Sequence, residues 1–138
     1  RAAVLARGSG IFFGDGLAEN WSALVRLGEG VYANSPFGRE LVPWSARYAE
    51  QGPILSRQGS YLLVLVPAAT DTRWFRQNIV DTAVSVCFLS GRLIFIGATD
   101  PATFACVVAF WGQPQFSDRF HDAFKMSGWF HEGRRYGD

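Results

Sequence analysis

The chain has 138 residues, of which 49% are hydrophobic and 15% are aromatic. This composition excludes an intrinsically disordered chain, and the length predicts one domain that buries about two-thirds of its unfolded surface. The formal net charge is only +1, so charge by itself indicates no particular kind of partner. The 13 basic residues include a single lysine, Lys125, and arginine suits forked contacts with phosphate better than lysine does.

Several kinds of protein and site are excluded by the pattern of apolar residues, cysteines and histidines. No apolar run reaches the roughly eighteen residues that a membrane-spanning helix needs, and no segment has the pattern of a signal peptide. Cys87 and Cys106 lie in apolar, strand-like runs, which favours buried free thiols in the reducing cytoplasm over a disulfide. These cysteines and the two histidines, His121 and His131, have no ligand-like spacing, so we expect no metal site. The chain begins with Arg1, which indicates either processing or a fragment of a longer protein.

The first third of the chain predicts short elements separated by glycines. Residues 1–7 are alanine-rich and predict a helix that the following glycines end. An apolar strand at 11–13 leads into a turn that carries Asp15. Residues 18–27 predict a short helix, and a β-prone run follows at 31–33.

The middle of the chain predicts longer elements. A helix is expected at 40–51, followed by a loop at 52–59 that contains glycine and proline. The continuous apolar run at 61–66 predicts a strand buried on both faces, as in a parallel sheet with helices on each side. A helix capped at 70–72 is then expected to run to about residue 83.

The last part of the chain completes an alternating pattern of strands and helices. Strands are expected at 85–89, 93–96 and 104–111, and an amphipathic helix at 115–127. The tail, residues 129–138, is expected to fray. This alternation, with no internal repeat or linker, predicts a single α/β domain over residues 1–138.

The strand at 31–33 runs into Asn34, Ser35, Pro36 and Phe37. Pro36 cannot donate to a ladder, so the strand should end here, and it holds Ser35 extended with its carbonyl in a fixed direction. An amide oxygen, an aimed carbonyl and an exposed ring can hold a planar base that carries an amine. The alternative is a strand-to-loop junction whose phenylalanine belongs to the core, because short motifs often match by accident.

Asp15 also follows a predicted strand, one helix before the strand that ends at Asn34. Ligands of open α/β sheets collect at the carboxyl ends of the strands. If the two strands are neighbours in one sheet, Asp15 and the tetrapeptide 34–37 face the same crevice. We therefore expect a ligand site between them.

Segments over about residues 12–128 match a known pattern in both type and order. They resemble the phage-type Dam-like DNA N-6-adenine methyltransferases, which belong to the amino-methyltransferases that use S-adenosylmethionine (AdoMet). The catalytic tetrapeptide of that larger group is Asp/Asn/Ser-Pro-Pro-Tyr/Phe. The matching segments are 15–17 with Trp21, 34–39 with Trp44, 65–68 leading into 70–75, 88–95, and the strand that ends in Trp111-Gly112.

The resemblance implies a role for several residues. Asn34 and the Ser35 carbonyl would hold the target amine of an adenine flipped out of double-stranded DNA, with Pro36 fixing the backbone. Phe37 would stack on the flipped base, and Asp15 would meet the adenine of AdoMet. The fold implied is a Rossmann-like methyltransferase sheet flanked by helices.

Two departures from the family pattern leave other functions open. Ser35 replaces the first proline of the tetrapeptide, which keeps the carbonyl but loosens the backbone that aims it. The family's cofactor-binding strand lies upstream of the matching segments, so we expect this chain to lack it. The alternatives are a cytosine N-4 methyltransferase and a non-catalytic domain that serves DNA binding or assembly. The sequence indicates neither a recognition site nor an oligomeric state.

Three arginines are candidates for contacts with DNA phosphates. Arg73 and Arg76 lie one turn apart on a predicted helix, where a solvated helix face is an equal alternative. Arg92 lies in a tight turn and is the better candidate. Trp74 and Trp111 adjoin apolar runs and are expected in the core.

Overall fold

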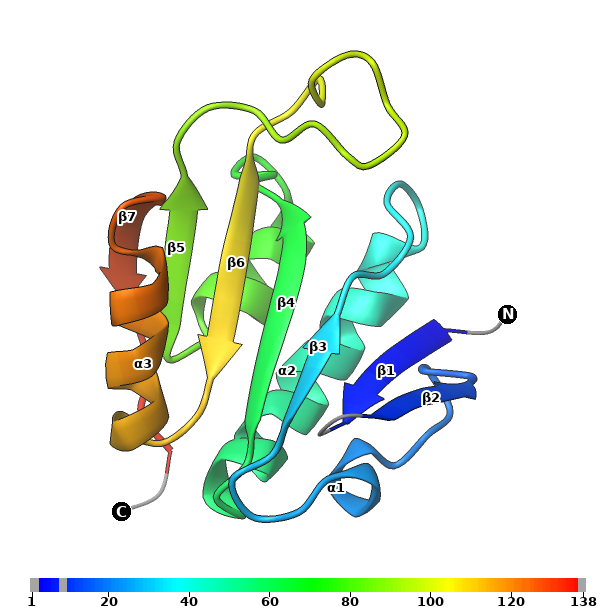
Figure 1. Ribbon diagram of the computed structural model, residues 1–138, viewed down its shortest axis with the longest axis vertical. Coiled ribbons are helices and arrows are strands. Elements are labelled where there is room, and N and C mark those ends of the chain that lie inside the picture. Colours follow the sequence, from blue (N-terminus) through cyan, green and yellow to red (C-terminus); the bar gives the residue numbers. More distant parts are fainter. Residues whose placement is uncertain (1–2, 8–9, 137–138) are drawn as a thin grey trace.

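A five-stranded sheet organises the structure, a computed structural model that describes residues 3–7 and 10–136 (Figure 1). The strands are β1 (Ala3–Arg7), β2 (Gly10–Gly14), β3 (Gly30–Ala33), β4 (Tyr61–Pro67), β5 (Ser85–Leu89), β6 (Cys106–Trp111) and β7 (Gly128–Glu132). The helices are α1 (Trp21–Leu24), α2 (Leu41–Arg57), the π-helix η1 (Phe75–Val80) and α3 (Pro114–Phe124). The expected α/β class is therefore confirmed.

The main sheet is mixed, with the strand order β3-β4-β6-β5-β7. β3 is parallel to β4, and β6 runs antiparallel to both β4 and β5. β3, β4 and β5 consequently run in the same direction, so their carboxyl ends lie at one edge of the sheet. β7 pairs antiparallel with β5, and β1 pairs with β2 in a separate two-stranded sheet.

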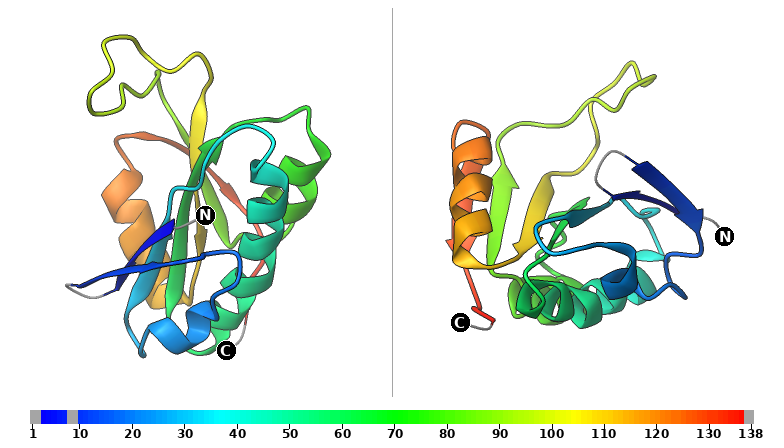
Figure 2. Two further views of the ribbon diagram at one scale, coloured as in Figure 1. Left: turned by 90° about the vertical axis from the view of Figure 1, so that its right-hand side faces the viewer. Right: turned by 60° about the horizontal axis from the view of Figure 1, so that its bottom comes forward.

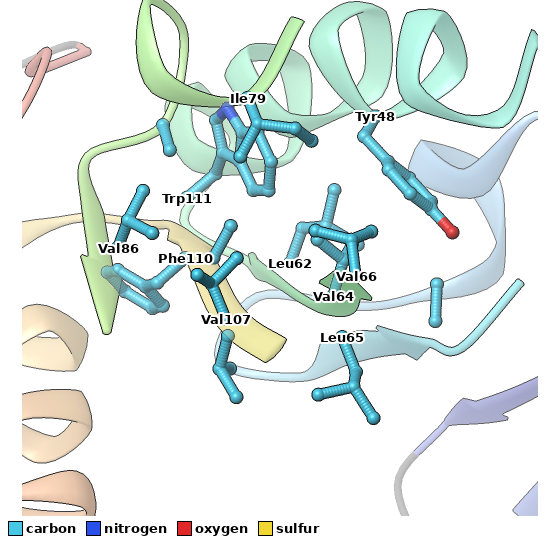
Figure 3. Packing of buried hydrophobic residues seen from close by; sticks show 14 of the residues in the cluster. Tyr48, Leu62, Val64, Leu65, Val66, Ile79, Val86, Val107, Phe110 and Trp111 are labelled. Atoms are coloured by element: carbon cyan, nitrogen blue, oxygen red, sulfur yellow. The ribbon is translucent and has the colours of Figure 1, made fainter. Parts of the chain in front are cut away.

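Helices lie on both sides of the main sheet (Figure 2). α2 and η1 cover one side, and α3 lies on the other side, near β5 and β6. The strand side chains alternate between these sides: Leu62, Val64 and Val66 are fully buried toward α2, and Leu65 points the opposite way (Figure 3). The run predicted as a strand buried between helices is thus β4.

Helix α2 ends six residues later than the sequence pattern predicts, so Gly52 and Pro53 lie inside it rather than in a loop. A Cβ atom at Gly52 would lie 2.5 Å from the indole of Trp111, so glycine lets the helix pack directly on β6. Trp44 and Leu55 of the same helix are buried in the core. Tertiary packing therefore outweighs the local breaking signals of glycine and proline.

Other element predictions were wrong at the two ends of the chain. Residues 3–7 form a strand instead of a helix, because their pairing with β2 outweighs the helical propensity of alanine; residues 1–2 lie outside the described part. The expected helix at 18–27 is reduced to the four residues of α1. Residues 129–132 of the tail belong to β7 instead of fraying as expected, and the buried Tyr136 donates from its hydroxyl to the Thr82 carbonyl at 2.6 Å; residues 137–138 lie outside the described part.

The middle of the chain follows the predictions more closely. Cys87 and Cys106 are buried and free, and Trp111 is fully buried, as expected, whereas Trp74 is half-buried. Residues 93–96, predicted as a strand, lie in the irregular connection between β5 and β6. That segment has apolar residues but gains no strand partner in the described part of the chain.

A polar cluster joins α3 to the edge of the sheet. His121 of α3 contacts the Glu132 carboxylate of β7 through Nε2, and its Nδ1 lies 2.7 Å from the Ser117 carbonyl oxygen. The hydroxyl of the buried Ser85 donates to Glu132 at 3.2 Å. His131 is exposed, whereas His121 is half-buried.

The environment of His121 favours its charged form. Partial burial disfavours the imidazolium, but the contacts with the Glu132 carboxylate and the Ser117 carbonyl outweigh that effect. The nearby Asp118 acts in the same direction, so the pKa of His121 lies above its ordinary value of 6.5. A pKa that is higher in the folded than in the unfolded chain stabilises the fold at low pH, and this stabilisation is lost as the pH rises through the folded value.

We therefore predict that Glu132→Gln lowers the free energy of unfolding more at about pH 5.5 than at about pH 9, by less than roughly 1 kcal/mol because both partners are partly exposed. Urea denaturation at the two pH values measures the difference. Glu50→Gln, which breaks the exposed Arg47–Glu50 pair of α2, is the control and should show no such pH dependence. An equal loss at both pH values for Glu132→Gln would contradict the prediction.

Candidate functional site

Three connections gather at the edge where β3, β4 and β5 end (Figure 1). Residues 34–40 follow β3, residues 68–74 follow β4, and residues 90–105 connect β5 to β6. The candidate residues 34–37, Arg73 and Arg92 all lie in these connections. Parallel pairing thus brings together residues that are distant in the sequence.

Asn34 is the first residue after β3 and continues its alternation of buried and exposed side chains. Val31 and Ala33 are buried, whereas Tyr32 and Asn34 are exposed. The amide of Asn34 makes no hydrogen bond within residues 15–136, the part whose side chains are described. Its oxygen and its NH2 group are therefore available to an external partner.

Ser35 points the other way, into the protein, and is only 6% exposed. Burial raises the pKa of Tyr48, a fully buried residue of α2, to about 12, and Ser35 partly counteracts this rise. The hydroxyls of Ser35 and Tyr48 are both buried without a hydrogen-bond partner within residues 15–136. Tyr48 in turn packs against Trp21 and Trp44, with ring centroids 5.9 and 6.1 Å away. Tyr48 carried no sequence signal beyond its position on the apolar face of a predicted helix.

Phe37 is half-buried and not the freely exposed ring that the sequence predicts. Its ring meets those of Phe104 and Phe95 at a steep angle, with centroids 5.3 and 6.3 Å away. Phe37 therefore packs against the 90–105 connection as well as against the hydrophobic core. Sequence reasoning missed Phe95 and Phe104 as partners because both lie more than fifty residues further along the chain.

The 90–105 connection projects beyond the edge of the sheet (Figures 1 and 2). It carries three consecutive apolar residues, Ile94, Phe95 and Ile96, with exposed fractions of 61%, 37% and 107%. The backbone N–H of Ala102 donates to the Leu93 carbonyl at 2.7 Å, which ties the two arms of the connection together. An apolar surface is thus exposed directly beside Phe37.

The three arginine candidates differ in their surroundings. Arg92 and Arg73 are exposed and make no ion pair within residues 15–136. The guanidinium of Arg76 donates to the Asp81 carboxylate at 2.8 Å and is already paired. Arg92 and Arg73 are therefore the freer of the predicted phosphate ligands.

Asp15 does not lie where the sequence argument placed it. It follows β2, which pairs with β1 in the small sheet, so the expectation that its strand neighbours β3 was wrong. The carboxylate is exposed, and its Oδ1 accepts the Leu17 N–H at 3.1 Å. The turn is nevertheless tied to α2, because the indole N–H of Trp21 donates to the Gly16 carbonyl at 2.9 Å and Trp21 packs on Trp44.

Two cavities lie elsewhere, on the side of the sheet that bears α3. One, of about 160 Å³, lies between Tyr61, Leu63 and helix α3. The other, of about 300 Å³, lies between the same two residues and the segment 28–32. Neither is lined by the tetrapeptide. Within the described ranges no cluster of side chains could hold a metal ion, and no helix is long and apolar enough to span a membrane.

The edge of the sheet therefore combines an exposed amide, a backbone carbonyl, an aromatic ring and two arginines without an ion pair in the described part of the chain. The first two are acceptors for an amine, the ring suits a planar group, and the guanidinium groups suit phosphate. Together these groups are appropriate for a nucleotide.

The comparisons with known proteins agree with this chemistry. Neither the curated proteins nor the solved structures give a match to the chain. Residues 14–117 match the family model described as DNA N-6-adenine-methyltransferase (Dam). This match covers well over half of the chain and includes the tetrapeptide and both free arginines. The chain belongs to the DNA N-6-adenine-methyltransferase (Dam) family.

Proposed function

We propose that the chain transfers a methyl group from AdoMet to the exocyclic N-6 amine of an adenine in double-stranded DNA. The observation that carries this proposal is the exposed, unpartnered amide of Asn34 at the end of β3, directly before the buried Ser35. Family membership supplies the reaction class, and the geometry supplies the residues that would bind the amine.

The chemistry requires little beyond positioning. An aromatic amine is a poor nucleophile because its lone pair is delocalised into the ring. Two acceptors, the Asn34 amide oxygen and the Ser35 carbonyl, would grip its two hydrogens and favour a more tetrahedral nitrogen. Holding that nitrogen in line with the methyl group then supplies most of the rate acceleration. The target adenine must leave the duplex to reach these groups.

Phe37 is proposed to stack on the flipped adenine, a contact worth about 1–3 kcal/mol in comparable sites. Its present neighbours, Phe95 and Phe104, belong to the connection that projects beyond the sheet. Binding of the base would therefore require Phe37 and this connection to adjust to each other. Arg92, at the start of the connection, is proposed to bind a phosphate of the same DNA.

The fit of AdoMet to the described residues is partial. AdoMet, when bound, supplies an electrophilic methyl group on its sulfonium. The Asp15 carboxylate is exposed, and its second oxygen makes no hydrogen bond within residues 15–136, so it could accept a hydrogen bond from the adenine amine of the cofactor. No group of this chain is assigned to the methionine end. We therefore propose Asp15 as the cofactor contact and no further geometry.

The sheet has some features of a Rossmann-like methyltransferase fold. Three strands run in the same direction, helices lie on both sides, and the candidate residues follow the carboxyl ends of the strands. We propose that these strands are one half of a Rossmann-like methyltransferase sheet.

A non-catalytic DNA-binding domain is the second candidate. The incomplete set of cofactor contacts favours it, since a chain that holds DNA at the same edge needs no methyl donor. A cytosine N-4 methyltransferase would use the same two acceptors. Analysis of the methylated nucleosides separates these three outcomes.

Asn34→Ala is predicted to lower the rate of methyl transfer by about 10²–10³-fold, because it removes one of two groups that grip the amine. Asn34→Asp, which keeps an acceptor oxygen, should retain most of the activity. The midpoint of thermal unfolding should hardly change in either variant, because the side chain is exposed. Methylation of adenine-unmodified DNA, followed by mass spectrometry of the nucleosides, gives the rates. Equal rates for wild type and Asn34→Ala would refute the role.

Arg92→Ala is predicted to reduce the slope of log K against log salt for DNA binding by about one unit, as expected for one lost phosphate contact. Arg73→Ala should act in the same way. Arg76→Ala is the matched control, because its guanidinium is paired with Asp81, and it should change the slope less. Fluorescence anisotropy over a series of salt concentrations measures the slopes. If neither Arg92→Ala nor Arg73→Ala alters the slope, DNA binds elsewhere.

For AdoMet, we predict weaker than micromolar binding to this 138-residue chain, because only one contact is assigned to it. Asp15→Ala should weaken that binding by about tenfold or more, as expected for a hydrogen bond to a charged acceptor. Isothermal titration calorimetry measures both, and Asp71→Ala, another exposed acid, is the control. Binding that Asp15→Ala leaves unchanged would exclude Asp15 as a cofactor contact. No binding to the wild-type chain would favour the non-catalytic candidate.

A further inference from the structure

The tip of the 90–105 connection exposes apolar side chains to water (Figures 1 and 2). Ile96 has an exposed fraction of 107%, the largest of any large apolar side chain within residues 15–136, and Ile94 is 61% exposed. Single exposed apolar residues are ordinary on a protein surface. Three in a row on a projecting segment are not, because packing within the described residues does not remove them from water. Such a segment indicates a surface that is buried in a complex.

The backbone holds Ile96 at the corner of a tight turn. The Ala98 N–H donates to the Phe95 carbonyl at 2.9 Å, which closes a four-residue turn over residues 95–98. Gly97 has a φ of 90°, the left-handed conformation that the third residue of a type II turn requires. Ile96 is the second residue of this turn, where a side chain points away from the flanking chain. The apolar tip is therefore held in one shape before it meets a partner.

The turn adjoins the residues proposed to bind the flipped adenine. Phe95, directly before Ile96, contacts the ring of Phe37 at 6.3 Å between centroids. Arg92 lies on the same connection, is exposed and makes no ion pair within residues 15–136. Asp100, the one acid of the connection, lies on its other arm. An apolar tip thus projects beside the proposed base site, with an available cation at its base.

We propose that Ile96 is a wedge that enters the base stack of double-stranded DNA at the position from which the target adenine is extruded. The inference rests on the proposed function, because it takes the extrusion of that adenine as given. Extrusion leaves a gap one base thick in the stack. A branched apolar side chain fills this gap without needing a hydrogen-bond partner, so it stabilises the extruded state.

Size and charge favour DNA over a protein as the partner of this tip. A stable protein interface buries about 800 Å² on each side, whereas the apolar run here consists of three consecutive residues, 94–96. The guanidinium of Arg92 suits a phosphate, and Asn34 and Phe37 beside the connection suit a base. Apolar side chains of this kind enter base steps in proteins that unstack and kink DNA.

Binding to a duplex with a missing base tests the insertion without methyl transfer and without a known recognition sequence. The probe is a fluorescent DNA duplex that carries one tetrahydrofuran abasic residue, and the same duplex with every base present is the comparison. The gap already exists in the abasic duplex, so the wedge enters it without displacing a base. We expect the wild type to bind the abasic duplex about tenfold more tightly than the paired one, as measured by fluorescence anisotropy.

Ile96→Ser is expected to lose this preference, because the serine side chain is too small and too polar to fill the gap. Ile96→Leu keeps the volume and should keep the preference. Leu27→Ser is the matched control and should also keep it, because Leu27 is 80% exposed but precedes β3, at the opposite end of that strand from Asn34. Arg92→Ala should weaken binding to both duplexes by the same factor, since a phosphate contact does not depend on the base.

Two results of the binding experiment would overturn the proposal: equal affinity of the wild type for the two duplexes, or an unchanged preference in Ile96→Ser. Sedimentation velocity tests the competing partner, a second copy of the chain. A wild-type dimer that Ile96→Ser abolishes would show that the other copy covers the tip, and this too would overturn the proposal. Monomers in both cases support it.

Methylation supplies a functional reading once the sites methylated by the wild type are mapped. Ile96→Ser should methylate paired sites about tenfold more slowly and should recover on sites whose adenine lies opposite an abasic residue, because an unpaired adenine leaves the stack more easily. Asn34→Ala should not recover, because its defect concerns the amine itself. An active wild type with no recovery in Ile96→Ser overturns the wedge. An inactive wild type counts against the proposed function, and the preference for abasic DNA then still decides whether Ile96 inserts.

Discussion

The close approach of α2 to β6 is the constraint on which the rest of the structure depends. Gly52 lies so near the indole of Trp111 that a single added methyl group would overlap the ring at 2.5 Å. The helix can therefore rest directly on a central strand of the sheet. Trp111 is fully buried beneath it, and the proline that follows Gly52 is accommodated although it removes one helical hydrogen bond.

The first half of the helix makes a second contact. Its Trp44 and Tyr48 pack against Trp21, whose indole N–H donates to the Gly16 carbonyl in the Asp15 turn. The acid turn, which follows a strand of the small sheet, is thus held to α2 by one aromatic cluster.

The sequence predicted what depends on local patterns and missed what depends on distant partners. The apolar run of β4 and the motif after β3 could be recognised because burial and the proline rule act within a few residues. Residues 3–7 were assigned to the wrong element because the pairing that holds them is not visible in alanine propensity. The same reason explains the wrong prediction at Gly52 and Pro53. Locally these residues indicate a loop, but they lie in a helix that packs against Trp111.

The candidate site divides in the same way. Asn34 and Arg92 could be proposed as site residues from the sequence alone, because polar residues at a strand end or in a tight turn are recognisable from their neighbours in the chain. The contacts of Phe37 with Phe95 and Phe104 required the fold, since no spacing rule links these residues. Asp15 shows the limit of such reasoning. A position directly after a strand predicts that a residue lies at the end of a sheet, but it does not predict which sheet.

The two sides of the tetrapeptide have opposite physical requirements. Asn34 is exposed and unpartnered within residues 15–136, as the proposed binding of an external amine requires, whereas Ser35 is buried. The alternation at the end of β3 satisfies both, because consecutive residues face opposite sides of the strand. Phe37 lies between these extremes: its contacts with Phe95 and Phe104 hold the ring in place, and a stacking base must compete with them. The proposed binding of a base beside Asn34 would therefore be energetically linked, through this one ring, to the position of the 90–105 connection.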